Sequence, residues 1–417
     1  SAHPAPRGPA AMAPKTNRCE EPEAAASPKR ARTGPGPESD AKASAGWVQI
    51  DSVSIRDYGS PSAASVAAFD MDSTLIKTKS GATFAKSKDD WEMWAPEVVP
   101  KLQELAAAGH KIVVISNQGG VAKGRTKLAD IQQKIDAMQK AMGVPLLAML
   151  MTCDDVFRKP LPASWKLMSS RFNGGVAVSV ERSFYCGDAA GRVPPVVKKK
   201  DFSASDLKFA LNVGVPFHTP EEFFLGKAQA YQKESFPFDP RTLGKSTEAF
   251  PVPPLDRQAL VLCVGPPGSG KSFAATQHLA ACTRVNQDIL KTKDKCLKAC
   301  KEALEAGKSV VVDNQNKTKA DRAPYLALAK AQKVEAVAIF HDVPKELCFH
   351  LNAYRLLDTK SSLHRAEKVP SMVIHAFYKN FDEPKTNEGF ASVHRVGLEH
   401  FTVSGDADLE LLRSFID

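Results

Sequence analysis

The stretch "SVAAFDMDSTLIKTKSG", Ser65 to Gly81, joins an apolar run directly to a pair of carboxylates. Its apolar part, Val66–Phe69, is typical of a buried strand, and Asp70 and Asp72 follow that strand at once. In open α/β sheets, ligands bind beyond the carboxyl ends of the strands. We therefore interpret this stretch as a central strand that ends in a cluster of groups facing a ligand.

Similar polar clusters follow other apolar runs farther along the chain. "KIVVISNQGG" ends in a loop that contains Ser116 and Asn117. "SFYCGDAAGR" contains Asp188, and "FRKP" places Lys159 shortly after the apolar run "LAMLMTC". The segments "VPKLQELAAAGH" and "LADIQQKIDAMQKAMG" lie between these runs and have the apolar spacing of helices. This alternation predicts a parallel sheet with helices on both faces, so the clusters should converge at one edge of the sheet.

The predicted cluster has a composition suited to phosphate chemistry. Carboxylates crowded at one edge repel one another, and a divalent cation relieves that repulsion; their hard oxygens favour Mg²⁺. A carboxylate can also attack phosphorus and form an aspartyl-phosphate, while Lys159 and the Ser116 hydroxyl hold the phosphoryl oxygens. A single Asp-x-Asp taken alone indicates a turn or a helix cap, but four clusters in order disfavour that alternative.

Four short motifs carry a resemblance to a known superfamily. "DMDST", "ISNQGG", "RKP" and "CGDAAGR" resemble the ordered motifs of haloacid dehalogenase-like phosphatases. The longer segment "KKKDFSASDLKFALNVGVPFHTPEEFFLG" is similar to the 3′-phosphatase domain of bifunctional polynucleotide phosphatase/kinases. The resemblance covers roughly residues 47–235. It implies a Rossmannoid phosphatase that hydrolyses 3′-phosphate ends of DNA.

This resemblance also implies a role for each residue of the motifs. Asp70 would be the nucleophile that forms the aspartyl-phosphate. Asp72 would be the general acid/base and a metal ligand through its backbone carbonyl, and Asp188 would complete the Mg²⁺ site with Asp70. The phosphoryl group would be bound by Thr74, Ser116, Asn117 and the catalytic Lys159. One departure is Ser73, which stands where close relatives usually have glycine.

A second phosphate-binding signature lies in "ALVLCVGPPGSGKS", Ala259 to Ser272. The pattern G-x-x-x-x-G-K-[ST] after a buried strand is typical of a P-loop, whose backbone N–H groups surround the phosphates of ATP or GTP. Lys271 would reach the β- and γ-phosphates, and the Ser272 hydroxyl would bind Mg²⁺. The predicted nucleotide-binding residues of this loop are Gly265, Gly268, Ser269, Gly270, Lys271 and Ser272. The following segment, "FAATQHLAAC", is expected to be a helix.

Two aspartates and a basic segment follow the P-loop. "VNQDILKT" places Asp288 near a helix start, where it could take a proton from an attacking hydroxyl or simply cap the helix. "KSVVVDNQN" places Asp313 at the end of another predicted strand, where it could hold metal, water or substrate. The segment "RLLDTKSSLHRAEK", residues 355–368, is interpreted as a lid that brings Arg355 onto the transferred phosphate, with a solvated helix as the alternative.

The second block is similar to the 5′-kinase domain of the same family. The similarity rests on "GPPGSGKS", "VNQD", "VVVDNQN" and "VPSMVIHAFYKNFDEPKTNEGF". It implies that Asp288 activates a DNA 5′-hydroxyl and that Arg355 is a lid arginine. Gln287 and Ala353 stand where the family commonly has arginine, so an inactive domain that serves only as a DNA-binding platform is an alternative. We expect no forkhead-associated module, so the partners of that module are not transferred.

Composition and linkers predict how the chain is divided. Its 417 residues carry a net charge of +9, which suggests an anionic partner such as DNA. Residues 1–46 are rich in Ala, Pro, Ser and Gly and are predicted to be disordered; their "PKRAR" indicates nuclear import or simply solvated charge. An organelle transit peptide is a minor alternative. We expect a phosphatase domain at 47–235, a Pro-rich linker at 236–257 and a kinase domain at 258–417, all of class α/β with parallel sheets.

The remaining features are less specific. The triple lysine Lys198, Lys199 and Lys200 either steers a polyanion or forms a solvated face. Eight scattered cysteines without a CxxC pair disfavour a zinc site and fit a reduced compartment. No apolar run is long enough to span a membrane. We therefore expect a monomeric nuclear enzyme that repairs DNA ends at strand breaks with Mg²⁺ and ATP. A metabolite phosphatase fused to a metabolite kinase and a non-enzymatic scaffold are the rival interpretations.

Overall fold

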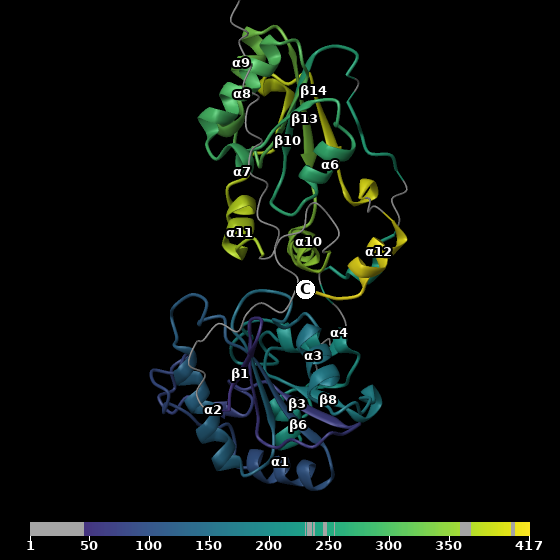
Figure 1. Ribbon diagram of the computed structural model, residues 1–417. Coiled ribbons are helices and arrows are strands. Elements are labelled where there is room, and N and C mark those ends of the chain that lie inside the picture. Colours follow the sequence, from purple (N-terminus) through teal and green to yellow (C-terminus); the bar gives the residue numbers. More distant parts are fainter. Residues whose placement is uncertain are drawn as a thin grey trace, which may run out of the picture. The chain divides into compact units, whose positions relative to one another are not determined.

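The computed structural model describes residues 46–417 apart from 230, 232–235, 237, 245–247, 254, 359–367 and 402–404. The predicted arm up to residue 45, including "PKRAR", lies outside the described residues, as does most of the predicted lid. The described part of the chain contains two large sheets, each with helices on both of its faces (Figure 1). In that part, no helix is long and apolar enough to cross a membrane.

The first sheet has seven strands in the order β1-β2-β7-β6-β3-β8-β9. The five strands from β7 to β9 are parallel, as the sequence predicts. The strands β2 and β1 extend the sheet in antiparallel orientation, and the sequence analysis did not predict them. The strands are β1 (Val48–Ile50), β2 (Val53–Asp57), β3 (Val66–Phe69), β6 (Lys111–Asn117), β7 (Leu147–Met151), β8 (Phe184–Cys186) and β9 (Phe217–His218). A small separate hairpin consists of β4 (Ile76–Lys77) and β5 (Glu92–Met93).

Both faces of the first sheet are buried, which explains why β3 and β7 are apolar throughout and why β6 is apolar from Ile112 to Ile115. Ala67 and Phe69 of β3 pack on one face with α1 (Val98–Ala107), α2 (Leu128–Met142) and α5 (Pro220–Leu225). Val66 and Ala68 pack on the other face with α3 (Ala163–Arg171) and α4 (Ser205–Val213). Burying one large side chain such as Phe69 contributes ~1.5–3 kcal/mol. Because this packing fixes β3 from both sides, the residues that follow it start from a rigid position.

The second sheet has five parallel strands in the order β11-β12-β10-β13-β14. They are β10 (Ala259–Val264), β11 (Thr283–Val285), β12 (Val310–Asp313), β13 (Glu335–His341) and β14 (Ser392–Val396). Leu260 and Leu262 of β10 face α8 (Lys293–Glu305) and α9 (Lys319–Ala331), whereas Val261 and Cys263 face α6 (Lys271–Gln277) on the other side. Helix α6 begins within the P-loop and ends five residues before the predicted end at Cys282.

Four further α-helices complete the described part of the chain around the second sheet. They are α7 (Gln287–Leu290), α10 (Lys345–Leu357), α11 (Ser371–Lys379) and α12 (Asp406–Arg413). Residues from the predicted linker also pack here. Leu243 is buried with side chains of α10 and α12, and Phe250 stacks on His278 with ring centroids 4.3 Å apart. Part of the segment 236–257 therefore packs on the second sheet's helices, while the exact domain limits stay a prediction.

Candidate active sites

The carboxyl ends of β3 and β8 and the first turn of α4 bring three carboxylates together beside a buried lysine; Asp70 and Asp206 are buried and Asp188 is half-buried. The backbone N–H of Asp70 donates to the Cys186 carbonyl at 2.9 Å, which ties the two strand ends to each other. Oxygens of Asp70, Asp188 and Asp206 lie within 4.8 Å of one another. Lys159 Nζ lies 2.6 Å from Asp70 Oδ1. The structure thus brings together the predicted nucleophile, metal ligand and lysine, and adds Asp206.

Lys159 is 2% exposed, and its ammonium is surrounded by oxygens. It donates to Asp70 and to the Tyr185 hydroxyl, each at 2.6 Å, and lies 2.8 Å from Asp206 Oδ1. Burial alone would lower the pKa of Lys159, but the carboxylates of Asp206 and Asp70 raise it overall. Lys159 therefore stays charged and can stabilise negative charge that develops near Asp70.

The positive charge of Lys159 does not fully compensate the negative charges of the carboxylates around it. Burial raises the pKa of Asp70 to about 7, with Lys159 opposing and Asp206 adding to the rise. Burial and then the charges of Asp70 and Asp206 raise the pKa of Asp188 to about 8. Such crowding of hard oxygen ligands is relieved when a divalent cation binds, so the donor set fits Mg²⁺. Three carboxylates are close enough to one another to hold such an ion, those of Asp70, Asp188 and Asp206.

Asp72 differs from Asp70 in being exposed, with 54% of its side chain accessible to solvent. Gln118 Nε2 donates to its Oδ2 at 3.0 Å, and Lys134 Nζ lies 3.6 Å from its Oδ1. An exposed carboxylate held in this way can exchange protons with a substrate or with water. Gln118 and Lys134 were missed at the sequence level. Gln118 lies in the motif "ISNQGG", which could have indicated it. Lys134 lies in the predicted helix "LADIQQKIDAMQKAMG", where nothing in the sequence distinguishes it from other helical residues.

The predicted phosphate ligands hold one another and the charged groups. Gln118 Nε2 donates to Ser116 Oγ at 2.9 Å. The Asn117 side chain binds both the backbone N–H and the carbonyl of Lys159, each at 3.0 Å. Thr74 is fully buried, and its Oγ1 lies 3.5 Å from Asp188 Oδ1. Asn117 and Thr74 thus fix the positions of Lys159 and Asp188; direct binding of phosphate by these two residues stays a prediction.

The backbone conformation at Ser73 explains why close relatives usually have glycine at this position. Its φ is +62°, in the left-handed region that favours glycine. A residue with a side chain is less stable than glycine in that region by roughly 1–2 kcal/mol. The glycine usual at this position therefore reflects the turn after β3, and the serine adopts the same backbone conformation.

The P-loop follows β10 and leads directly into α6. Gly268 has a φ of +84°, and a Cβ atom there would lie 2.7 Å from the Cys348 carbonyl oxygen, so only glycine fits. Lys271 is 8% exposed, and its Nζ donates to the Pro266 carbonyl at 2.5 Å. Burial lowers the pKa of Lys271 to about 8, while Asp313 acts in the opposite direction. The lysine thus folds back onto its own loop.

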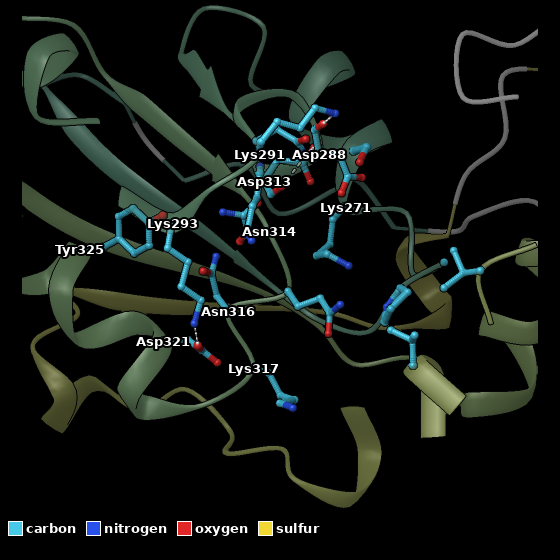
Figure 2. Close-up of a pocket in the computed structure, with 18 of the residues that line it drawn as sticks. Lys271, Asp288, Lys291, Lys293, Asp313, Asn314, Asn316, Lys317, Asp321 and Tyr325 are labelled. Carbon is cyan, nitrogen blue, oxygen red and sulfur yellow. Dashed lines mark hydrogen bonds and ion pairs between the residues drawn. The ribbon is translucent and has the colours of Figure 1, made fainter. Parts of the chain in front are cut away.

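A cavity of about 890 Å³ opens beside the P-loop. Figure 2 shows its lining, with the Lys293–Asp321 ion pair, 2.5 Å long, in the wall. The predicted kinase residues that line the cavity are Gly268, Lys271, Ser272, Asp288, Asp313 and Arg355. Asp288 is exposed, and Lys291 Nζ donates to its backbone carbonyl at 2.6 Å. The cavity is large enough for the ends of two substrates to meet.

Asp313 is buried and strongly bound within the protein. Arg284 Nε donates to its carboxylate at 2.9 Å, and Asn286 Nδ2 does so at 3.1 Å. Arg284 therefore balances the charge of Asp313. The sequence analysis missed Arg284 because it lies on β11, a strand of only three residues.

The two departures in the kinase motifs occupy different surroundings. Gln287 lines the large cavity, and its backbone N–H donates to Asn314 Oδ1 at 2.8 Å. Ala353 is fully buried and is not part of the cavity wall. Lys291 and Lys317 also line the cavity. Positive charge is thus present near Gln287 even though arginine is not.

Comparison with known proteins matches both halves of the chain. Residues 65–224 match the family model described as polynucleotide kinase 3 phosphatase, and residues 260–384 match that of an AAA domain. A bifunctional polynucleotide phosphatase/kinase of Schizosaccharomyces pombe is 37% identical over 355 residues, which are 84% of each chain. The polynucleotide 3′-phosphatase ZDP of Arabidopsis thaliana is 35% identical over 185 residues, which are 41% of this chain and 25% of that protein.

Proposed function

Given that this chain belongs to the family of bifunctional polynucleotide phosphatase/kinases, we propose that its two sites prepare the two ends of a DNA strand break for ligation. The first site removes the 3′-phosphate, and the second phosphorylates the 5′-hydroxyl. The products are the 3′-hydroxyl and 5′-phosphate that a ligase joins. The net charge of +9 supports a polyanionic substrate.

In the phosphatase site, Asp70 acts as the nucleophile. One of its oxygens attacks the phosphorus of the 3′-phosphate, and the bond from phosphorus to the 3′-oxygen breaks. Asp72, exposed at the mouth, gives a proton to the departing 3′-oxygen. Asp72 then takes a proton from the water that attacks the phosphoryl group on Asp70, which releases inorganic phosphate and restores the carboxylate.

Lys159 and Ser116 stabilise charge in both of these steps. The Lys159 ammonium lies 2.6 Å from Asp70, so it is next to the phosphoryl oxygens when they are bonded there. Ser116 is 2% exposed and lies in the last two residues of β6, at the carboxyl end of that strand. Mg²⁺, held by Asp70 and Asp188 and, as the family resemblance implies, the Asp72 carbonyl, would neutralise phosphoryl charge when bound.

In the kinase site, Asp288 receives the proton of the DNA 5′-hydroxyl while that oxygen attacks the γ-phosphorus of ATP. The bond from the γ-phosphorus to the oxygen that bridges to the β-phosphate breaks, and ADP leaves with that oxygen. Lys271 turns from the Pro266 carbonyl to the phosphates, and Arg355 approaches from the same cavity. Ser272 and Asp313 are the residues placed near a Mg²⁺ that accompanies ATP. A smaller cavity on the other side of the P-loop, lined by Phe273 and His400 among others, is suited to the adenine ring.

The observation that carries this proposal is the Asp70–Lys159 pair, buried at the end of a central strand and next to Asp188. The test is a DNA nick with a 3′-phosphate and a 5′-hydroxyl, incubated with protein, Mg²⁺ and γ-labelled ATP. We expect release of phosphate and label transfer, each lost separately in Asp70→Asn and Lys271→Ala. Label transfer that survives Lys271→Ala, or equal turnover of sugar phosphates, would contradict the proposal.

Two further properties belong to the proposal. We propose that the chain acts in the nucleus, on the strength of the basic "PKRAR" sequence, and that it acts as a monomer. Microscopy of a fluorescent fusion with and without that sequence tests the first property, and light scattering tests the second. Retention of nuclear fluorescence after the deletion would remove the support for import by this sequence.

A further inference from the structure

Asp206 is a buried carboxylate that none of the sequence motifs identified. It lies in the first turn of α4 and is 2% exposed. Its Oδ1 is 2.8 Å from Lys159 Nζ, and its Oδ2 accepts the backbone N–H of Ala189 at 3.0 Å. Both oxygens therefore have partners in the protein, and one of those partners is the lysine of the active site.

The surroundings of Lys159 indicate what its contact with Asp206 does. An ammonium group has three N–H donors, and Lys159 meets three oxygens, from Asp70, Tyr185 and Asp206. Only Asp70 changes during the reaction, because it loses its free negative charge when it is bonded to phosphorus. Asp206 and the Tyr185 hydroxyl, which donates to the Ile115 carbonyl at 3.1 Å, are unchanged. They can keep the ammonium in place while its third partner reacts.

The backbone beside Asp206 is shaped to admit its carboxylate. A Cβ atom on Gly187 would lie 2.4 Å from Asp206 Oδ2, so a side chain there would displace the carboxylate. The bond from Ala189 anchors Asp206 to the same loop that carries Asp188. Gly187, Ala189 and Lys159 thus fix the position of the Asp206 carboxylate, one oxygen of which also lies within 4.8 Å of oxygens of Asp70 and Asp188.

We propose that Asp206 is a positioning residue of the phosphatase reaction, which holds the Lys159 ammonium against Asp70 before and after the phosphoryl group is transferred. Loss of Asp206 would leave Lys159 buried with one anchor fewer and free to follow the phosphoryl group. The inference rests on the proposed role of Asp70 as nucleophile. The competing explanation is that Asp206 is itself a metal ligand.

The test compares Asp206→Asn with Asp136→Asn in the full chain. Asp136 is a matched control, because it accepts a hydrogen bond from Arg56 at 2.8 Å in the same domain and is not part of the site. With a 3′-phosphorylated oligonucleotide we expect Asp206→Asn to lower kcat by ~10–100-fold, with little change in KM. The affinity for Mn²⁺ alone is measured by electron paramagnetic resonance, and we expect it to change by less than about threefold. Removing a residue that hydrogen-bonds a metal ligand typically lowers metal affinity by ~10–100-fold, which is a clearly larger loss.

A double-mutant cycle with Lys159→Gln separates positioning from general stability. If Asp206 acts through Lys159, adding Asp206→Asn to Lys159→Gln lowers kcat by no more than about twofold, because the shared interaction is already lost. A full multiplicative loss, an unchanged kcat in the single variant, or a loss of Mn²⁺ affinity as large as the loss of activity would overturn the proposal. If thermal unfolding shows that Asp206→Asn does not fold, Asp206→Ser is judged by the same criteria.

The outcomes also distinguish this inference from the proposed function. Activity retained in Asp70→Asn would remove the nucleophile and with it the basis for positioning Lys159. An inactive Asp70→Asn together with a fully active Asp206→Asn would leave the proposed mechanism intact and overturn the role of Asp206 alone.

Discussion

The two active sites act on the same group, a phosphoryl group. They differ in how far their side chains are already held in place before a substrate binds. In the phosphatase site the predicted nucleophile and its lysine are buried and bound to each other: Asp70 is 8% exposed and Lys159 is 2% exposed. In the kinase site Asp288 is exposed and Lys271 is bound to its own loop, beside a cavity of about 890 Å³.

The difference follows from what each reaction requires. In the proposed mechanism the phosphatase uses one of its own carboxylates as a reactant, so that carboxylate must be rigidly placed and desolvated beforehand. The kinase transfers a group between two bound substrates, so its side chains can be brought into place when ATP and the DNA end arrive. We therefore expect the phosphatase to be more sensitive to small changes of geometry than the kinase.

The largest effect should come from removing the buried nucleophile. Asp70→Asn should lower the phosphatase kcat by at least ~10³-fold, since loss of a covalent nucleophile in other enzymes costs up to about 10⁶. The kinase rate of the same molecules serves as the internal control and should stay within about twofold, because Asp70 is not among the residues that line the cavity beside the P-loop. Loss of both activities together in a folded protein would contradict the assignment of Asp70 to the phosphatase site alone.

The exposed base should matter less than the buried nucleophile. Asp288→Asn should lower the kinase kcat by ~10²–10⁴-fold, the usual contribution of a positioned general base, and leave the phosphatase unchanged. Label transfer from γ-labelled ATP measures the first effect. If Asp288→Asn retained full kinase activity, Asp288 would only cap α7, and the cavity would need another base.

The lysines around the kinase cavity should affect binding rather than chemistry. Lys291→Ala should raise KM for a 5′-hydroxyl oligonucleotide several-fold with kcat nearly unchanged, because Lys291 supplies charge beside Gln287 in the cavity wall. The salt dependence of binding should also become shallower, by a log–log slope of about 0.7–0.9 per lost phosphate contact. Lys308→Ala, on an exposed residue outside the cavity, is the control. An unchanged KM for Lys291→Ala would show that the DNA strand passes elsewhere.

The smallest predicted effect concerns the turn after β3. Ser73→Gly should stabilise the protein by about 0.5–1 kcal/mol, because glycine relieves the left-handed φ of +62° but gains freedom in the unfolded chain. Ser87→Gly, on an exposed loop residue without a positive φ, should lower stability instead. Denaturant unfolding measures both variants. A destabilised Ser73→Gly would mean that the serine side chain has a role in the site.

The sequence predicts the reacting groups better than the residues that hold them. Asp70, Lys159 and Asp188 could be found because each follows an apolar strand, and a parallel sheet brings such ends together. Asp206 could not, because an acidic residue in the first turn of a helix is common and favourable by itself. Its pairing with Lys159 depends on where α4 packs, which no local pattern encodes.

The same limit applies to the fold. The parallel strands were predictable from apolar runs between helices, whereas β1 and β2 alternate over few residues and pair antiparallel at the edge of the sheet. Thr74 shows the limit within a motif. The resemblance implies that Thr74 binds phosphate, which stays a prediction, but no sequence pattern indicates that Thr74 is fully buried with its hydroxyl next to Asp188.

The central claim is that Asp70 carries the phosphoryl group between the two steps, and it can be observed directly. The protein is mixed with a 3′-phosphorylated oligonucleotide, quenched in acid within one turnover and digested for mass spectrometry. The account predicts a phosphoryl group on the peptide that contains Asp70, with none in Asp70→Asn. A phosphoryl group on another residue, or turnover in Asp70→Asn at the native rate, would contradict it.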